Sequence, residues 1–139
     1  MDLAQGLSFV RTRKQGVLTT IRSNGRPQLS NILYLLGDDD LARISVTADR
    51  AKTVNLRHDA RASLYVLGDS FWQYVVLEAT ADLSPVAADP NDATVDQLVD
   101  YYRVAVGEHE NWDDYRASMV TDKRLILTLH PDHAYGIGP

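Results

Sequence analysis

The alternation of apolar and polar residues predicts that most of this chain is β-structure. Six stretches have strand character: 16–22, 26–37, 41–47, 62–67, 71–83 and 123–137. The last is expected to bend at Pro131, since proline interrupts a strand's hydrogen bonding. Between the first two strands, Asn24 and Gly25 form an Asn-Gly pair, which favours the positive φ values of a tight hairpin.

Helical spacing of apolar residues marks the remaining segments. Residues 2–13 carry an apolar stripe and predict a short amphipathic helix. A second helix of about two turns is expected between the third and fourth strands. The interval 84–122 predicts two more helices, separated by Gly107. Their signals are Asp89 or Asp92 as the first cap, an apolar face of Val95, Leu98, Val99 and Tyr102, and Asn111 as the second cap.

These elements indicate one mainly β domain over residues 1–139, an antiparallel six-stranded barrel with helices outside. The segments "NILYLL" and "YVVLEA" are apolar on both faces of their strands. One face can fill the barrel, but the other also needs cover, because monomers rarely expose broad apolar patches. The sequence therefore predicts a homodimer.

Composition and charge narrow the function. The formal net charge of −5 argues against nucleic acid as the main partner. The chain has no cysteine, which excludes disulfides, thiolate chemistry and zinc–cysteine sites. Without a signal-peptide pattern or an apolar run near 20 residues, we expect a cytoplasmic protein with no membrane contact.

Cations gather around the short second helix: Arg50, Lys52, Arg57 and Arg61. Arg50 and Lys52 fall at the start of the helix, where the helix dipole favours acids instead. A bound phosphate would resolve this conflict by accepting hydrogen bonds from the free N–H groups and from both side chains. The alternative is a solvated basic turn that Asp49 partly neutralises.

Two further groups of polar and aromatic side chains each allow two interpretations. Gln28, Ser30 and Asn31 put amides and a hydroxyl into an apolar strand, where they could read the edge of a heterocycle or simply face solvent. Trp72 and Tyr74 share a strand face and could stack on a flat ring or belong to a core or interface.

No sequence motif points to chemistry carried by the chain's own side chains. The histidines in "HPDH" (130–133) and "GEHE" (107–110) lack a spacing that requires a metal, so we expect none. There is also no nucleophile elbow, Walker loop or dinucleotide fingerprint. If the protein is an enzyme, a bound cofactor supplies its chemistry.

Three segments together resemble the flavin/deazaflavin split-barrel superfamily, which includes pyridoxamine 5′-phosphate oxidase. They are "GVLTTIRSNGRPQLSNILY", "ISVTADRAKTVNLRHDARASLYV" and "DYRASMVTDKRLILTLHPDHAYG". Within the superfamily, the chain is most similar to actinobacterial oxidoreductases that use coenzyme F420. The resemblance implies a split β-barrel homodimer with two cofactor grooves at its interface.

The resemblance also implies which residues bind the cofactor. Its phosphate would sit between the third strand and the short helix, and the ring would lie along the second strand, with a nearby aromatic side chain. The tail of coenzyme F420 carries glutamates, which Arg11, Arg13 and Lys14 could meet. The implied cofactor-binding residues are Gln28, Ser30, Asn31, Ser45, Val46, Thr47, Arg50, Ala51, Lys52, Trp72 and Lys14.

The implied function is an F420-dependent reductase that passes a hydride to an unsaturated or quinone-like small molecule. No catalytic side chain can be named, although Tyr34, Tyr65 and Tyr74 are candidate proton donors. The alternatives are an FMN-binding pyridoxamine 5′-phosphate oxidase-like protein, a haem-handling protein and a non-catalytic F420 carrier. The vitamin B6 oxidase reading is weakened because no arginine follows Arg124.

Overall fold

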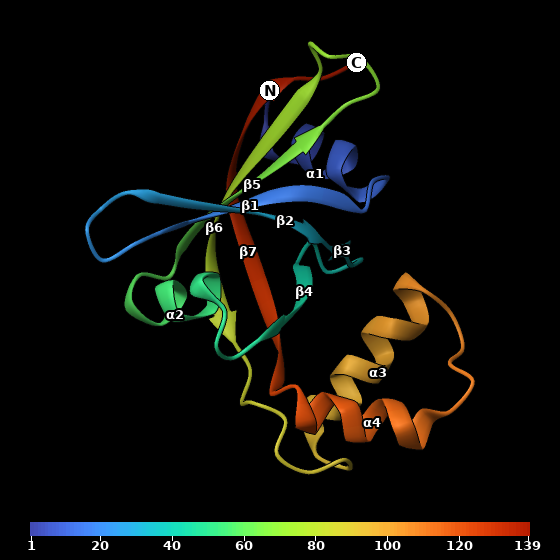
Figure 1. The fold of residues 1–139 in the computed structure, drawn as a ribbon. Coiled ribbons are helices and arrows are strands. Elements are labelled where there is room, and N and C mark those ends of the chain that lie inside the picture. Colours follow the sequence, from blue (N-terminus) through green and yellow to red (C-terminus); the bar gives the residue numbers. More distant parts are fainter.

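A computed structural model describes residues 1–139 as one curled antiparallel sheet flanked by four helices (Figure 1). The elements follow the order α1 (Leu3–Arg11), β1 (Gln15–Ile21), β2 (Pro27–Leu33), β3 (Leu35–Leu36), β4 (Ala42–Thr47), α2 (Ala51–His58), β5 (Arg61–Leu67), β6 (Tyr74–Leu83), α3 (Ala93–Ala105), α4 (Trp112–Thr121) and β7 (Arg124–Ile137). No helix is long and apolar enough to cross a membrane.

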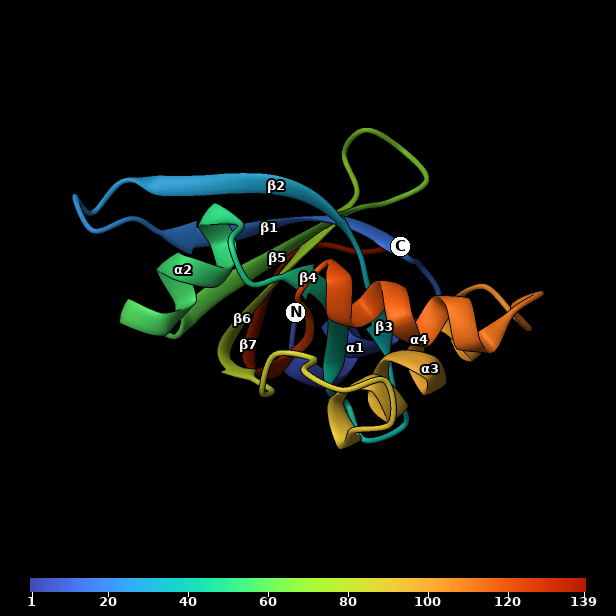
Figure 2. The same ribbon diagram turned by 60° about the horizontal axis from the view of Figure 1, so that its bottom comes forward.

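The sheet has the strand order β2-β1-β5-β6-β7-β4-β3, and all neighbouring strands are antiparallel. It curls into a half-barrel, so that β2 and β4 lie on facing sides of an open seam. Figure 2 shows α2 beneath the β1–β2 hairpin at one end of the sheet, with α3 and α4 together at the other side of β4. The architecture is the mainly β, barrel-like fold with outer helices that the sequence predicted.

The sheet has seven strands rather than the expected six, because the stretch 26–37 breaks at Tyr34. The Tyr34 backbone N–H leaves the sheet ladder and donates to the Lys14 carbonyl oxygen at 2.9 Å. Its hydroxyl donates to the Val10 carbonyl oxygen at 2.7 Å. These bonds tie the break to the end of α1 and let β3 turn away to pair with β4.

Two local expectations are corrected as well. In the β1–β2 turn only Gly25 has a positive φ (84°), and its N–H donates to the Arg22 carbonyl oxygen at 2.8 Å. The turn spans residues 23–25 as expected, but Asn24 does not take the positive φ that an Asn-Gly hairpin turn favours. The fifth predicted strand begins at Tyr74 instead of residue 71, so Trp72 lies in the β5–β6 loop.

The helix ends agree with the sequence signals. The side chain of Asp92 caps α3 by accepting from the Val95 N–H at 2.8 Å, and Asn111 caps α4 by accepting from the Asp114 N–H at 3.1 Å. Gly107 follows α3 with a φ of 123°, which suits glycine. These caps fix where the helical pair begins and ends.

The hydrophobic core fills the inside of the curl. Its fully buried side chains alternate along the strands, as in Leu18 of β1, Leu64 of β5 and Leu125 and Leu127 of β7. A second cluster joins Leu98 of α3 to the rest of the helical pair and to β7. The outer face of the sheet has no such cover: its exposed apolar residues, 47–59% accessible, are Leu29, Leu33, Leu67, Tyr135 and Ile137.

Candidate functional site

The candidate site lies where β4 ends and α2 begins, beside the seam that β2 and β4 flank. Alternation along β4 buries Ile44 and Val46 in the core and turns Ser45 and Thr47 to the other face. The chain then enters α2 with Arg50 as its N-cap, and no side chain caps the helix. The first turn of α2 has no acid, so its free N–H groups face no compensating negative charge.

Three cations converge on this helix start. Strand pairing places Arg124, the first residue of β7, opposite Thr47. The Arg124 Nη1 lies 3.4 Å from the Ser45 carbonyl oxygen and 3.5 Å from the Ser45 hydroxyl, both long contacts. Burial, followed by the charges of Arg50 and Arg124, lowers the pKa of Lys52. We call Ser45, Arg50, Lys52 and Arg124 the anion clamp.

The clamp's charges lack acidic partners. None of Arg50, Lys52 and Arg124 forms a salt bridge within 4 Å, although eight such pairs exist elsewhere in the chain. Asp49 is fully exposed and lies near enough to Arg50 and Lys123 for both charges to lower its pKa, after the larger effects of the Thr47 hydroxyl and of its own backbone. It therefore offsets the clamp only through solvent, where interactions between exposed charges are weak.

Two buried hydroxyls beside the seam have no hydrogen-bond partner: Thr47 Oγ1 and Ser30 Oγ. The Thr47 hydroxyl is close enough to Asp49 to lower the pKa of that carboxylate, but the pair lacks hydrogen-bond geometry. Buried polar groups without partners are rare in folded proteins and call for an explanation. Both fall on residues that the sequence assigned to a cofactor.

The polar residues of β2 divide between its two faces, as alternation requires. Gln28 and Ser30 pair with Thr20 and Leu18 of β1 on the inner side, while Asn31 is exposed on the outer side. The Asn55 Nδ2 donates to Thr20 Oγ1 at 3.1 Å and so ties α2 to β1 next to Gln28. Because β2 contacts both α2 and β4, Gln28 and Ser30 lie on the strand next to the elements that carry the clamp.

Not all predicted residues reach the seam within one chain. Ala51 lies in the first turn of α2 and can offer its N–H, but Val46 is 1% exposed and can offer only its backbone. Trp72 is 74% exposed in the β5–β6 loop. This loop is separated from α2 by the seven residues of β5, about 23 Å of strand. Lys14 precedes β1 at that same distant end.

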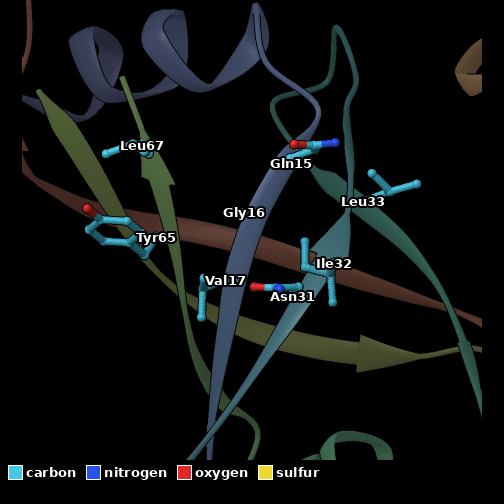
Figure 3. Close-up of a pocket in the computed structure, with 8 residues that line it drawn as sticks. All are labelled: Gln15, Gly16, Val17, Asn31, Ile32, Leu33, Tyr65 and Leu67. Atoms are coloured by element: carbon cyan, nitrogen blue, oxygen red, sulfur yellow. The ribbon is translucent and has the colours of Figure 1, made fainter. Parts of the chain in front are cut away.

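Asn31 lies instead on the outer face, where it borders a shallow basin of about 490 Å³. Figure 3 shows the basin between β5, β1 and β2, with Tyr65 and Leu67 on one side and Asn31 and Leu33 on the other. A neighbouring depression of similar volume shares Val17 and Tyr65 with it. The outer face therefore carries two adjoining, mainly apolar hollows, whose polar side chains are Gln15, Asn31, Thr19 and Ser63.

The tyrosines proposed as proton donors lie away from the clamp. Tyr34 is 2% exposed, its hydroxyl is already bonded to Val10, and burial raises its pKa well above the usual value. Its role is structural. Tyr65 and Tyr74 stack on the outer face with ring centroids 5.6 Å apart.

Sequence reasoning missed Arg124 and Tyr101. The Tyr101 hydroxyl on α3 donates to the Leu33 carbonyl oxygen at 3.3 Å and lies near the Ser45 backbone and Arg124. Burial raises its pKa, so the phenol stays neutral near pH 7. Neither residue belongs to a local motif. Only knowledge that β4 pairs with β7 would have placed Arg124 beside Thr47.

Comparison with known proteins gives one family and several similar folds. Residues 4–138 match the sequence profile of pyridoxamine 5′-phosphate oxidase. A solved F420 reductase is 23% identical, with a TM-score of 0.66 over 92% of this chain and 94% of that one. A conserved hypothetical protein from Mycobacterium tuberculosis is also 23% identical, with a TM-score of 0.70 over 96% and 82% of the two chains.

The solved structures of similar fold also include a haem-related protein. A haem storage protein from Vibrio cholerae is 13% identical, with a TM-score of 0.67 over 93% of this chain and 89% of that one. At these identities the solved structures establish the fold alone.

Proposed function

This chain belongs to the pyridoxamine 5′-phosphate oxidase family, and from that premise we propose that it is an F420-dependent reductase. The observation that carries the proposal is the anion clamp. Arg50 and Arg124 lie close enough to Lys52 for their charges to lower its pKa, at an uncapped helix start whose first turn has no acid. Keeping three like charges together costs stability, and a phosphate bound at the clamp would offset that cost.

The residues at the seam fit a phosphate-bearing flavin-type cofactor. The clamp supplies charge-assisted donors to the phosphate, and the first N–H groups of α2 add backbone donors. The orphaned hydroxyls of Thr47 and Ser30 are two further polar groups at the seam that need partners. Gln28 offers an amide, with both a donor and an acceptor, on the same side of β2.

When bound, reduced F420 supplies a hydride to an unsaturated or quinone-like acceptor. The chain's own residues bind the phosphate, orient one ring face and exclude water from it. Tyr101, beside Ser45 and Arg124, donates its hydroxyl proton to the Leu33 carbonyl oxygen at 3.3 Å, so near the clamp its oxygen is free to accept rather than to donate. Solvent can supply the proton where no side chain does.

The proposal includes a homodimer, in which the outer face of the sheet is the interface. That face carries the basin of Asn31, Tyr65 and Leu67 and several half-exposed apolar side chains. A partner subunit would remove this apolar surface from water and add residues to the cofactor site. Asn31 and Trp72, which lie far from the clamp of their own chain, could then contact the cofactor bound by the partner. Light scattering after size exclusion tests it; a monomer at micromolar concentration would exclude it.

The activity test compares cofactors on the same protein. We expect calorimetric titration to give tighter binding of F420 than of FMN, and reduced F420 to be consumed when a quinone acceptor is added. Tighter binding of FMN, or a protein purified with flavin or haem bound, would overturn the F420 assignment. Binding of F420 without turnover across a panel of quinones and enones would leave a carrier instead of an enzyme.

A further inference from the structure

A second positively charged region lies at the far end of α2 from the clamp. The tip of the β1–β2 hairpin and the side of α2 enclose a groove of about 470 Å³. Its ionisable lining residues are Arg22 from the hairpin and His58, Asp59 and Arg61 from the end of α2 and the start of β5. We call this the hairpin groove.

The end of the molecule that carries both the clamp and the hairpin groove is opposite in charge to the rest of the protein. Segments 20–30 and 49–61 hold six of the 14 lysines and arginines and two of the 19 acids, a formal charge of +4. The remaining eight cations and 17 acids give −9. Such an asymmetry steers anionic ligands toward one end of the molecule.

Within the hairpin groove, the only acid is already neutralised. Asp59 binds the Arg61 guanidinium through both oxygens, at 3.0 and 2.7 Å, which lowers its pKa to about 2. Arg22 and the neighbouring Arg57 have no acidic partner within 4 Å. Arg26 on the same hairpin is likewise without an acidic partner. Of these unpaired arginines Arg22 lines the groove itself, and Arg57 follows its lining residue Val54 by one helical turn.

One face of α2 connects the groove to the clamp. Arg50, Val54 and Arg57 follow each other at i, i+4 and i+7, so they share a face. Val54 is 43% exposed and lines the groove. Eight helical residues rise about 12 Å, a distance that roughly four extended peptide residues cover. An anionic chain attached to a group in the clamp can reach the groove along α2.

We infer that the hairpin groove binds the glutamate tail of coenzyme F420, an inference that rests on the proposed function. The sequence had pointed to Arg11, Arg13 and Lys14 for this role. The structure pairs Arg11 with Asp40 and Arg13 with Asp69, and it places all three cations at the end of β1 away from α2. Arg22 and Arg57 are free and lie on the clamp's side of the molecule.

The experiment measures the affinity for two forms of F420, one with no glutamate and one with at least four. Both forms are titrated into the wild-type protein, into the Arg22→Glu/Arg57→Glu double variant, and into Lys14→Glu as a matched control at the other end. For the wild-type protein we expect about tenfold tighter binding of the long-tailed form at low salt, falling toward equality at 0.5 M salt. The double variant is expected to lose this preference, and Lys14→Glu to keep it.

The outcomes separate this inference from the proposed function. Equal affinity of the wild type for both forms overturns the assignment of the tail to the hairpin groove, and so does a preference that survives in the double variant. Neither result affects the assignment of F420 as the cofactor. Loss of the preference in Lys14→Glu alone places the tail at the other end and also overturns it. If neither form binds the wild-type protein, the F420 assignment itself fails. Arg22, Arg57 and Lys14 are all exposed, so thermal unfolding should be unchanged in the variants.

Discussion

The substitution Lys52→Ala separates a functional charge from a structural one. Lys52 makes no salt bridge, and burial and two neighbouring cations lower its pKa. In the free protein its charged form is therefore held at a cost. A structural lysine would instead have an acidic partner and a pKa that is not lowered by like charges.

The expected effect on binding follows from the loss of one charge-assisted hydrogen bond. Such a bond to a phosphate contributes about 1.5–3 kcal/mol. The dissociation constant for F420 should rise about 10- to 150-fold, since each 1.4 kcal/mol is a factor of ten. The free energy of unfolding of the ligand-free protein should stay the same or rise, because a half-buried charge beside two like charges is removed.

The assay is calorimetric titration at fixed salt, paired with urea unfolding of the ligand-free variants. Lys123→Asn is the matched control: Lys123 is exposed, has a φ of 54° that asparagine tolerates, and lies near Asp49. We expect its dissociation constant to change less than about threefold. An unchanged affinity in Lys52→Ala, or a loss in stability of more than about 1 kcal/mol, would refute the reasoning.

Three further predictions follow from the same geometry. Arg124→Gln should weaken binding by about tenfold without lowering stability, and titration of the variant measures it; unaltered binding would remove Arg124 from the clamp. Because the pKa of Lys52 is lowered, its positive charge is lost at a pH below the usual pKa near 10.5, and the affinity for F420 should fall as the pH rises through that lowered value. Lys52→Arg should show no such decline when binding is titrated at a series of pH values from 7 to 10.5. Tyr34→Phe should lower the free energy of unfolding by about 1 kcal/mol, since the Val10 carbonyl oxygen still accepts from the Arg13 N–H at 3.1 Å. The F420 affinity of this variant should match that of the wild type. A marked loss of affinity would show that Tyr34 belongs to the cofactor site.

Local sequence signals predicted the elements well, because they depend on neighbouring residues alone. The caps Asp92 and Asn111 and the alternation along β4 are of this kind. The break at Tyr34 escaped prediction because it depends on bonds to Val10 and Lys14, partners from another part of the chain. The uninterrupted apolar run of "NILYLL" gives no local sign of it.

The candidate site divides in the same way. By itself the sequence determined that Arg50 and Lys52 would crowd a helix start without an acid, since this conflict lies within one helical turn. Only the tertiary structure decided that Arg124 joins them, because the pairing of β4 with β7 brings together residues 77 positions apart. It also decided that Lys14 and Trp72 lie at the opposite end of the sheet. Positions along a strand fix the face of a side chain, but only the order and curl of the strands fix which distant charges it meets.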